Sequence, residues 1–235
     1  MNVNPYNGKI YSFDYKLIDI NNDANIAPDP EVQAIADQYN EKIRPLMETY
    51  VGKSNDEIVK KIDDGNMDGA LGTLICDALR AETEADLAVY NLGGIRIDAI
   101  PAGDIKLDTA FRLLPFDDPV VTVKMKGADV LKLMDQMANS KVGPLQTSSN
   151  LEAVYDAAAK DFTSLKLNGK DIDPEADYTV STTEFVSKGG DNYTAFEKGE
   201  FLQTTDMTRD IFVQYIKNNK EVNAPAVGRI KIVNK

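Results

Sequence analysis

The chain has 235 residues, of which 43% are hydrophobic and 27% charged; these proportions are ordinary for a globular protein, and the length allows a sizeable core without disulfide or metal support. The formal net charge of −12 argues against DNA, RNA or anionic lipid as partners, although local arginines could still hold a small anionic ligand. The sequence has no histidine, which excludes Ser-His-Asp and Cys-His catalysis and leaves only carboxylate sites, of the kind that bind Mg²⁺ or Ca²⁺, for a metal.

Membrane spans, leader sequences and reactive thiols are not indicated. No run of about eighteen apolar residues is present, so no membrane span is expected. The first residues, Met-Asn-Val-Asn-Pro, lack the basic start and apolar stretch of a signal peptide. The single cysteine, Cys76, lies in the apolar run Leu-Ile-Cys-Asp-Ala-Leu. We predict a buried structural thiol there, since no histidine is present to activate it.

The first fifty residues are expected to form a hairpin arm and one long helix. The stretch 9–20 alternates like a strand. Asp29 is suited to cap a helix, and apolar residues then recur at helical spacing as far as Tyr50. Pro45 should kink or split this helix, and Gly52 should end it.

The remaining chain mixes short helices and strands in irregular order. This favours an α+β domain with a mixed sheet over a doubly wound parallel sheet. The dipeptide Asn168-Gly169 is a strong signal for a type I′ hairpin turn. The spacing predicts helices over 71–82, from 127 onward and over 207–218, a helical turn over 109–114, strands over 86–90, 119–126, 178–183 and 229–233, and a hairpin over 162–172.

Three loops combine glycine or proline with polar and aromatic groups. Residues 91–96 read Asn-Leu-Gly-Gly-Ile-Arg, in which the glycines let backbone N–H groups approach a ligand and the arginine can fork onto a phosphate. The alternative is a tight turn with a surface arginine. Residues 113–118 read Leu-Leu-Pro-Phe-Asp-Asp, which places an aromatic ring either at a loop rim or in the core below a turn.

The third loop, residues 183–193, reads Thr-Glu-Phe-Val-Ser-Lys-Gly-Gly-Asp-Asn-Tyr. Its aspartate can accept two hydrogen bonds from a ribose diol, a charge-assisted contact of about 1.5–3 kcal/mol where water is excluded. The alternative is a loop that uses Gly-Gly-Asp only for its turn geometry. Taken singly, none of the three loops decides between a ligand site and a plain turn.

Taken in order, the three loops resemble the C-terminal domain of the 5'-nucleotidase family, which includes ecto-5'-nucleotidases and bacterial UDP-sugar hydrolases. The family carries an Asn-Gly-Gly-Gly-Ile-Arg loop, a Leu-Pro-Phe segment and a Phe-Leu-x-x-Gly-Gly-Asp-Gly-Tyr segment. The corresponding residues here are 91–96, 114–116 and 185–193, and the run 71–78 is similar to the family's first helix. The resemblance covers about residues 9–235.

The resemblance implies the fold and a set of substrate-binding residues. The fold would be a mixed-sheet layered α+β domain over residues 51–235, preceded over residues 1–50 by a short hairpin from the end of a metallophosphoesterase domain and a long connector helix. By the resemblance, Phe116 and Phe185 would stack on the base and Asn91 would contact it. Arg96 would contact the phosphate, Asp191 the ribose, and the backbone of Gly93 and Gly94 would approach the ligand. Asp118 stands where some members have a base-contacting asparagine.

Some positions depart from the family pattern. Leu92 and Asn192 replace glycines, although asparagine tolerates left-handed backbone. The stretch before the first helix lacks the arginine that many members use to hold the phosphate, which leaves Lys60 or Lys61 as substitutes. A carboxylate at Asp118 would favour exocyclic amino donors and repel phosphate.

The resemblance also implies the chemistry. Two divalent metals are expected in the family's N-terminal domain, with no cofactor in this chain, so the isolated chain is expected to bind a nucleotide or nucleoside and to hydrolyse nothing. That domain would be the partner in cis, and the protein would act outside the cytoplasm, as an extracellular, periplasmic or surface phosphoesterase. The alternatives are a binding or scaffold module that has lost catalysis, and an acid-only metal site at Asp63, Asp64 and Asp68.

Overall fold

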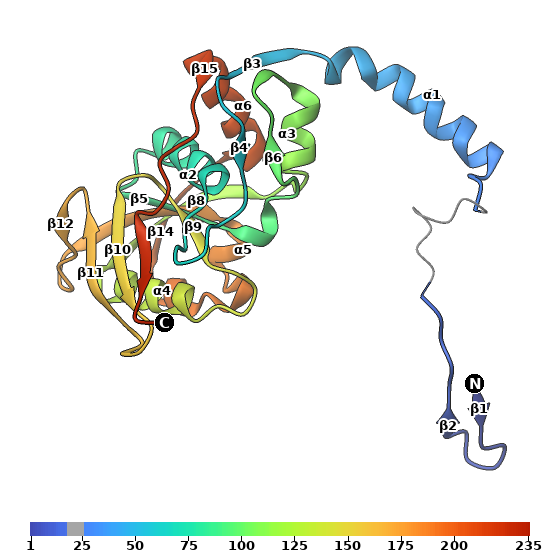
Figure 1. The fold of residues 1–235 in the computed structure, drawn as a ribbon, viewed down its shortest axis with the longest axis horizontal. Helices are drawn as coiled ribbons and strands as arrows, with labels where there is room; N and C mark the ends of the chain where they lie inside the picture. Colours follow the sequence, from blue (N-terminus) through green and yellow to red (C-terminus); the bar gives the residue numbers. More distant parts are fainter. Residues whose placement is uncertain (18–25) are drawn as a thin grey trace. The chain divides into compact units, whose positions relative to one another are not determined.

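The computed structural model describes residues 1–17 and 26–235. By its internal contacts, the chain divides into two compact units, residues 1–45 and residues 46–235. The larger unit contains all three loops that the sequence analysis singled out (Figure 1).

The smaller unit holds a short hairpin and most of helix α1 (Pro30–Met47). Strand β1 (Asn2–Val3) pairs antiparallel with β2 (Ile10–Ser12), and the end of the predicted arm, 18–20, lies outside the described residues. Asp29 caps α1 as predicted, because its Oδ1 accepts hydrogen bonds from the backbone N–H groups of the second and third residues of the helix.

The expectation that Gly52 ends this helix was wrong. The helix runs through Pro45 without being split and ends at Met47, and Gly52 lies in strand β3 (Tyr50–Ser54). A Cβ at Gly52 would come within 2.6 Å of Ile216 Cγ2 and 2.9 Å of the Lys220 carbonyl oxygen. Glycine is therefore needed here for close packing, which local spacing cannot reveal because the contacting residues lie far along the chain.

A five-stranded mixed sheet forms the middle layer of the larger unit. Strands β13 and β5 run parallel, and the other neighbours in the sheet are antiparallel. The predicted α+β class with a mixed sheet is confirmed. The strand order is β14 (Glu200–Met207), β8 (Pro119–Lys126), β13 (Asp177–Thr183), β5 (Leu87–Asn91) and β9 (Leu145–Thr147).

The remaining strands form smaller sheets. The hairpin between β11 and β12 turns where predicted, since Asn168 and Gly169 both have left-handed backbone, with φ of 51° and 74°. The four-stranded sheet has the order β12 (Lys170–Asp171), β11 (Asp161–Leu167), β10 (Leu151–Asp156) and β16 (Ile230–Val233). The three-stranded sheet has the order β15 (Glu221–Val222), β3 and β7 (Gly103–Lys106). A two-stranded sheet pairs β4 (Ile58–Val59) with β6 (Ala99–Ile100).

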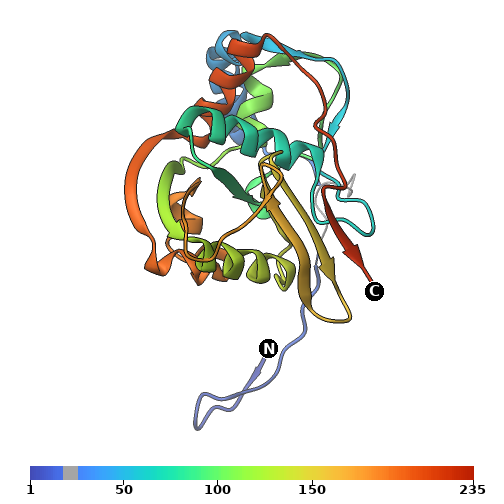
Figure 2. The same cartoon turned by 90° about the vertical axis from the view of Figure 1, so that its left-hand side faces the viewer.

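Helices cover both faces of the five-stranded sheet (Figure 2). Helices α2 (Ala70–Thr83), α3 (Leu107–Leu113) and α6 (Thr208–Asn219) pack on one face, and α4 (Gly127–Ala138) packs on the other. Side chains of the predicted strand β8 alternate between the two faces: Val120 joins the first core cluster, while Val121 and Val123 join the second.

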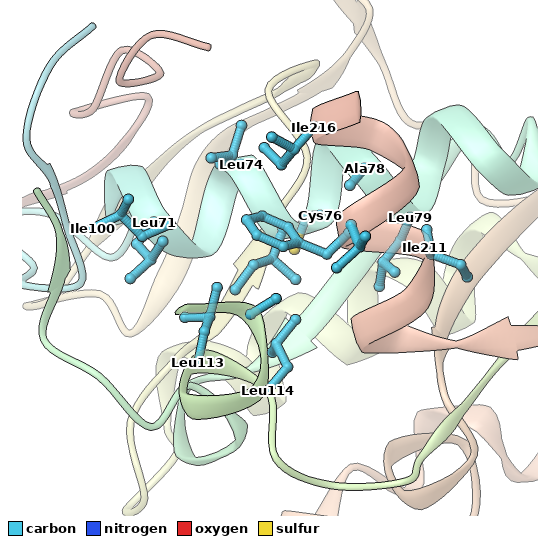
Figure 3. Packing of buried hydrophobic residues seen from close by; sticks show 14 of the residues in the cluster. Leu71, Leu74, Cys76, Ala78, Leu79, Ile100, Leu113, Leu114, Ile211 and Ile216 are labelled. Carbon is cyan, nitrogen blue, oxygen red and sulfur yellow. The ribbon is translucent and has the colours of Figure 1, made fainter. Parts of the chain in front are cut away.

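The core under α2, α3 and α6 anchors the loop that begins at Pro115. Leu113 and Leu114 are fully buried and point toward side chains of α2 and α6 (Figure 3). Cys76 lies in the same cluster and is fully buried, as predicted, and burial raises the pKa of its thiol well above the usual value. The chain therefore leaves the core immediately before Phe116.

Candidate ligand-binding site

The three loops converge on one cavity of about 500 Å³. This volume falls within the range of small-molecule sites in proteins. Every residue of the predicted binding set except Arg96 lines the cavity. The lining consists of Tyr90, Asn91, Gly93, Gly94, Phe116, Asp117, Asp118, Phe185 and Asp191.

Two half-exposed phenylalanines line this cavity. Phe116 is 50% exposed and Phe185 is 49% exposed, so neither is a core residue. Phe185 lies on the short helix α5 (Glu184–Ser187). A Cβ at Gly190 would come within 2.6 Å of the Phe185 ring and of its carbonyl oxygen. Gly190 therefore allows the following loop to pass close to the ring, and a larger residue would displace one of them.

The first and third loops are joined by a hydrogen bond. Asn91 Nδ2 donates to Asp191 Oδ2 at 2.9 Å. Asp191 and Asn192 both have left-handed backbone, with φ of 55° and 68°. Aspartate and asparagine tolerate this conformation better than most residues, so Asn192 fits the position where the family has glycine, as predicted. The turn holds the Asp191 carboxylate at the cavity.

Asp118 connects the two aromatic loops. Its backbone oxygen accepts hydrogen bonds from Thr208 N at 3.1 Å and Thr208 Oγ1 at 3.0 Å. Its Oδ1 accepts from Phe185 N at 3.3 Å. Burial raises the pKa of the Asp118 carboxyl, and nearby Glu184 acts in the same direction, while the hydrogen bonds from Phe185 N–H and Thr183 lower it in part. The carboxylate is thus partly withdrawn from water at the cavity wall.

Arg209, at the start of α6, contacts the loop 113–118 that carries Phe116. Its guanidinium stacks on the Phe111 ring at 4.1 Å from the centroid. It donates to the Leu114 carbonyl at 3.3 Å and to Asp117 Oδ1 at 2.8 Å. These two bonds bracket Pro115 and Phe116, so the position of the ring depends on a side chain distant in sequence.

We expect Arg209→Met to lower the free energy of unfolding by about 1–3 kcal/mol, because the buried Leu114 carbonyl loses its partner and the Phe111 ring loses a cation. Arg112→Met is the matched control. The Arg112 side chain is 70% exposed and pairs with Asp108 at 3.6 Å, a surface contact of about 0–1 kcal/mol. Urea unfolding of both variants measures the difference, and equal losses would contradict the assignment.

Arg96 lies beside the cavity, outside its lining. Its guanidinium carbon is 5.8 Å from the centroid of the Phe116 ring, and its Nη1 donates to the Gly93 carbonyl at 3.3 Å. Lys60 supports the same loop, since its Nζ donates to the Ile95 carbonyl at 2.8 Å. Lys60 therefore contacts the loop that ends in Arg96.

The acidic residues before α2 do not suit a metal. Asp68 is buried and accepts hydrogen bonds from three backbone N–H groups, and Asp64 pairs with Lys235. In the part of the chain that the structure describes, no group of three or more His, Cys, Asp or Glu is arranged to hold a metal ion.

Several residues of the site were not predicted from the sequence. Tyr90 and Asp117 line the cavity next to predicted residues, and adjacency in sequence was the available signal. A Cβ at Gly94 would come within 2.6 Å of Tyr90 Oη, so this glycine also serves close packing. Thr208 and Arg209 had no signal, because their contacts with the loop of Phe116 are long-range.

Comparison with known proteins identifies the family. The family profile described as "5'-nucleotidase, C-terminal domain" matches residues 50–198, which is more than half of the chain. The chain belongs to this family. The predicted resemblance is confirmed. The matched residues lie in the larger unit, whose loops line the cavity.

Relatives of this family member are considerably longer. "Protein UshA" of Yersinia enterocolitica is 28% identical over 207 residues, covering 85% of this chain and 36% of its own length. "Cell wall protein Lmo0130" of Listeria monocytogenes is 26% identical over 223 residues, covering 85% and 28%. The chain thus spans about a third of the length of these curated relatives.

A solved structure shows the same fold. The 5'-nucleotidase precursor from Thermus thermophilus matches 87% of this chain and 43% of its own, with a TM-score of 0.75 and 24% identity. Among residues 1–17 and 26–235, no helix combines the length and apolar character needed to cross a membrane.

Proposed function

We propose that this chain is the substrate-specificity domain of a 5'-nucleotidase-type phosphohydrolase and binds a nucleotide or nucleoside. The observation that carries the proposal is the placement of two half-exposed rings, Phe116 and Phe185, on the wall of one cavity of about 500 Å³. An exposed aromatic ring in a cavity offers a stacking surface to a flat base, worth about 1–3 kcal/mol per base.

The polar lining suits the other parts of a nucleoside. One carboxylate oxygen of Asp191 accepts a hydrogen bond from Asn91. The carboxylate has further lone pairs that can accept hydrogen bonds from the vicinal hydroxyls of ribose. Among the described residues that line the cavity, none is lysine or arginine. We therefore assign the uncharged base and sugar to the cavity, and the phosphate to its outside, near Arg96.

The catalytic metals would come from another domain of the same protein. The resemblance places two divalent metals in a metallophosphoesterase domain, where they activate water and polarise the phosphate. Apolar residues of α1 support packing against such a domain, since Val32, Ile35 and Tyr39 are 65%, 57% and 61% exposed. We assign residues 1–50 to the end of that domain and the interdomain helix, and residues 51–235 to substrate binding.

The proposal also covers location. Export to the periplasm, the cell surface or the medium is supported by the Listeria relative, which is named a cell wall protein. Detection of the native protein in extracellular or envelope fractions of its source cells would agree with this location, and detection in the cytosol alone would contradict it.

Titration of the purified chain tests the function. We expect adenosine or AMP to release heat on binding, and AMP incubated with the chain and Mn²⁺ to remain intact, because the chain lacks histidine and its described residues hold no ligand cluster for metals. Absence of binding by adenosine, AMP and a UDP-sugar would favour the scaffold alternative. Phosphate release that is proportional to protein and lost in Phe116→Ala would refute the expected inactivity.

A further inference from the structure

The segment 139–144 joins helix α4 to strand β9 and contacts two loops of the site, the first loop at 91–96 and the third loop at 183–193. We refer to this segment as the strap. All of its residues lie outside the cavity lining. The strap leads directly into β9, whose Leu145 pairs with Asn91 of the first loop. The sheet therefore fixes one end of the strap beside the first loop.

Leu92 attaches the strap to the first loop. The backbone of Gly143 has a φ of 100°, a conformation that favours glycine. A Cβ at this position would come within 2.9 Å of Leu92 Cδ2. The Leu92 side chain, which is partly buried against the first core cluster, therefore lies directly against the backbone of the strap.

Tyr193 attaches the strap to the third loop. Its side chain is buried, with 2% exposed, and its Oη donates to the Gly143 carbonyl at 3.3 Å. Burial raises the pKa of the Tyr193 hydroxyl, and a hydrogen bond with the side chain of Ser140, also in the strap, lowers it in part. The buried ring therefore holds the third loop to the strap through its hydroxyl.

The first and third loops are thus connected by two routes. Asn91 donates directly to Asp191 at 2.9 Å. The second route runs through the strap, because Leu92 and Tyr193 both contact Gly143. Since the two routes close a ring, displacement of one loop must either break one of these contacts or displace the other loop.

We propose that the strap couples the first and third loops, with Leu92 and Tyr193 as positioning residues, so that order in one loop imposes order on the other. The coupling is a property of the free chain, whereas its effect on affinity rests on the proposed nucleoside site. A ligand that contacts both loops finds them already in place, so less conformational freedom is lost on binding. The strap therefore favours binding without touching the ligand.

Hydrogen exchange of the free chain tests the coupling. Tyr193→Phe removes only the hydroxyl and keeps the buried ring, whereas Leu92→Ala removes the contact with the strap. The amides of Ile95 and Asn192 report on the two loops, because each is hydrogen bonded within its own loop. We expect Tyr193→Phe to speed exchange at Ile95, and Leu92→Ala to speed exchange at Asn192, by about threefold or more.

Tyr178→Phe and Leu107→Ala are the matched control variants. The Tyr178 hydroxyl accepts from the backbone N–H of Asp173 at 3.0 Å, and Leu107 is partly buried against the same core cluster as Leu92. Both control residues lie outside the cavity lining. Exchange in the two loops should be the same in these variants as in the unaltered chain. General destabilisation would also speed exchange across the five-stranded sheet, whereas loss of coupling is confined to the loops and the strap.

Adenosine titrations test the consequence for binding. Tyr193→Phe and Leu92→Ala should each weaken adenosine binding by about three- to tenfold. The double variant should lose less than the product of the two single losses, since both changes open the same ring.

The outcomes separate the coupling from the proposed function. Faster exchange that stays within the altered loop in both variants would overturn the coupling, whether or not a nucleoside binds. Faster exchange in the opposite loop with unchanged adenosine affinity would confirm the coupling and overturn its role in binding. If no nucleoside binds the unaltered chain, the proposed function fails, and exchange alone decides the coupling.

Discussion

Removing either cavity ring is expected to weaken adenosine binding by about 1–3 kcal/mol, which is roughly five- to 150-fold in Kd. Phe116→Ala and Phe185→Ala each take away one stacking surface. Because both rings are half exposed, their loss should leave the fold largely intact. Calorimetric titration measures the affinity, and circular dichroism melting curves confirm that the variants fold.

The control for this pair is Phe201→Ala. Phe201 lies on strand β14, is 61% exposed and is outside the cavity lining. Its removal should leave Kd within about twofold, as expected for a surface substitution. The double variant of Phe116 and Phe185 adds a coupling measurement, because two rings that contact the same base should lose affinity non-additively. Unchanged affinity in both single variants would show that neither ring touches the ligand.

Asp68→Ala is expected to cause the largest loss of stability, about 3–5 kcal/mol, because it removes one partner of a buried ion pair. The Asp68 side chain is 0% exposed and its Oδ2 lies 3.6 Å from Arg229 Nε. It also accepts from the backbone N–H groups of Gly228, Arg229 and Ile230, all at 3.2 Å. The substitution leaves the three backbone N–H groups without this acceptor and the guanidinium without its counter-ion, although the guanidinium keeps its hydrogen bonds to the Ser148 and Leu151 carbonyls.

Asp64→Ala provides the contrast. The Asp64 side chain is 98% exposed and pairs with Lys235, so its removal should change the free energy of unfolding by about 0–1 kcal/mol. Urea unfolding gives both values. Hydrogen exchange should also show that Asp68→Ala loses protection first around Met67 and Ile230, whose backbone groups are bonded to each other. Similar stability for the two variants would contradict the structural role of Asp68.

Local chemistry in the sequence determined many elements and the identity of the binding loops. The cap at Asp29, the turn at Asn168 and Gly169, and the alternation from Val120 to Met125 are effects of neighbouring residues, so they could be predicted without the fold. The order of the three loops was specific enough to predict the family. By contrast, the exposed edge strand β14 was missed, because its burial does not alternate along most of its length.

Only the tertiary structure decided which distant groups meet. The bond between Asn91 and Asp191 joins residues 100 positions apart, and that between Arg209 and Asp117 joins residues 92 positions apart. The position of Arg96 outside the cavity lining was likewise settled by packing. Local preferences act over a few residues, whereas the choice of partner across the cavity depends on how sheet and helices bury their apolar faces together.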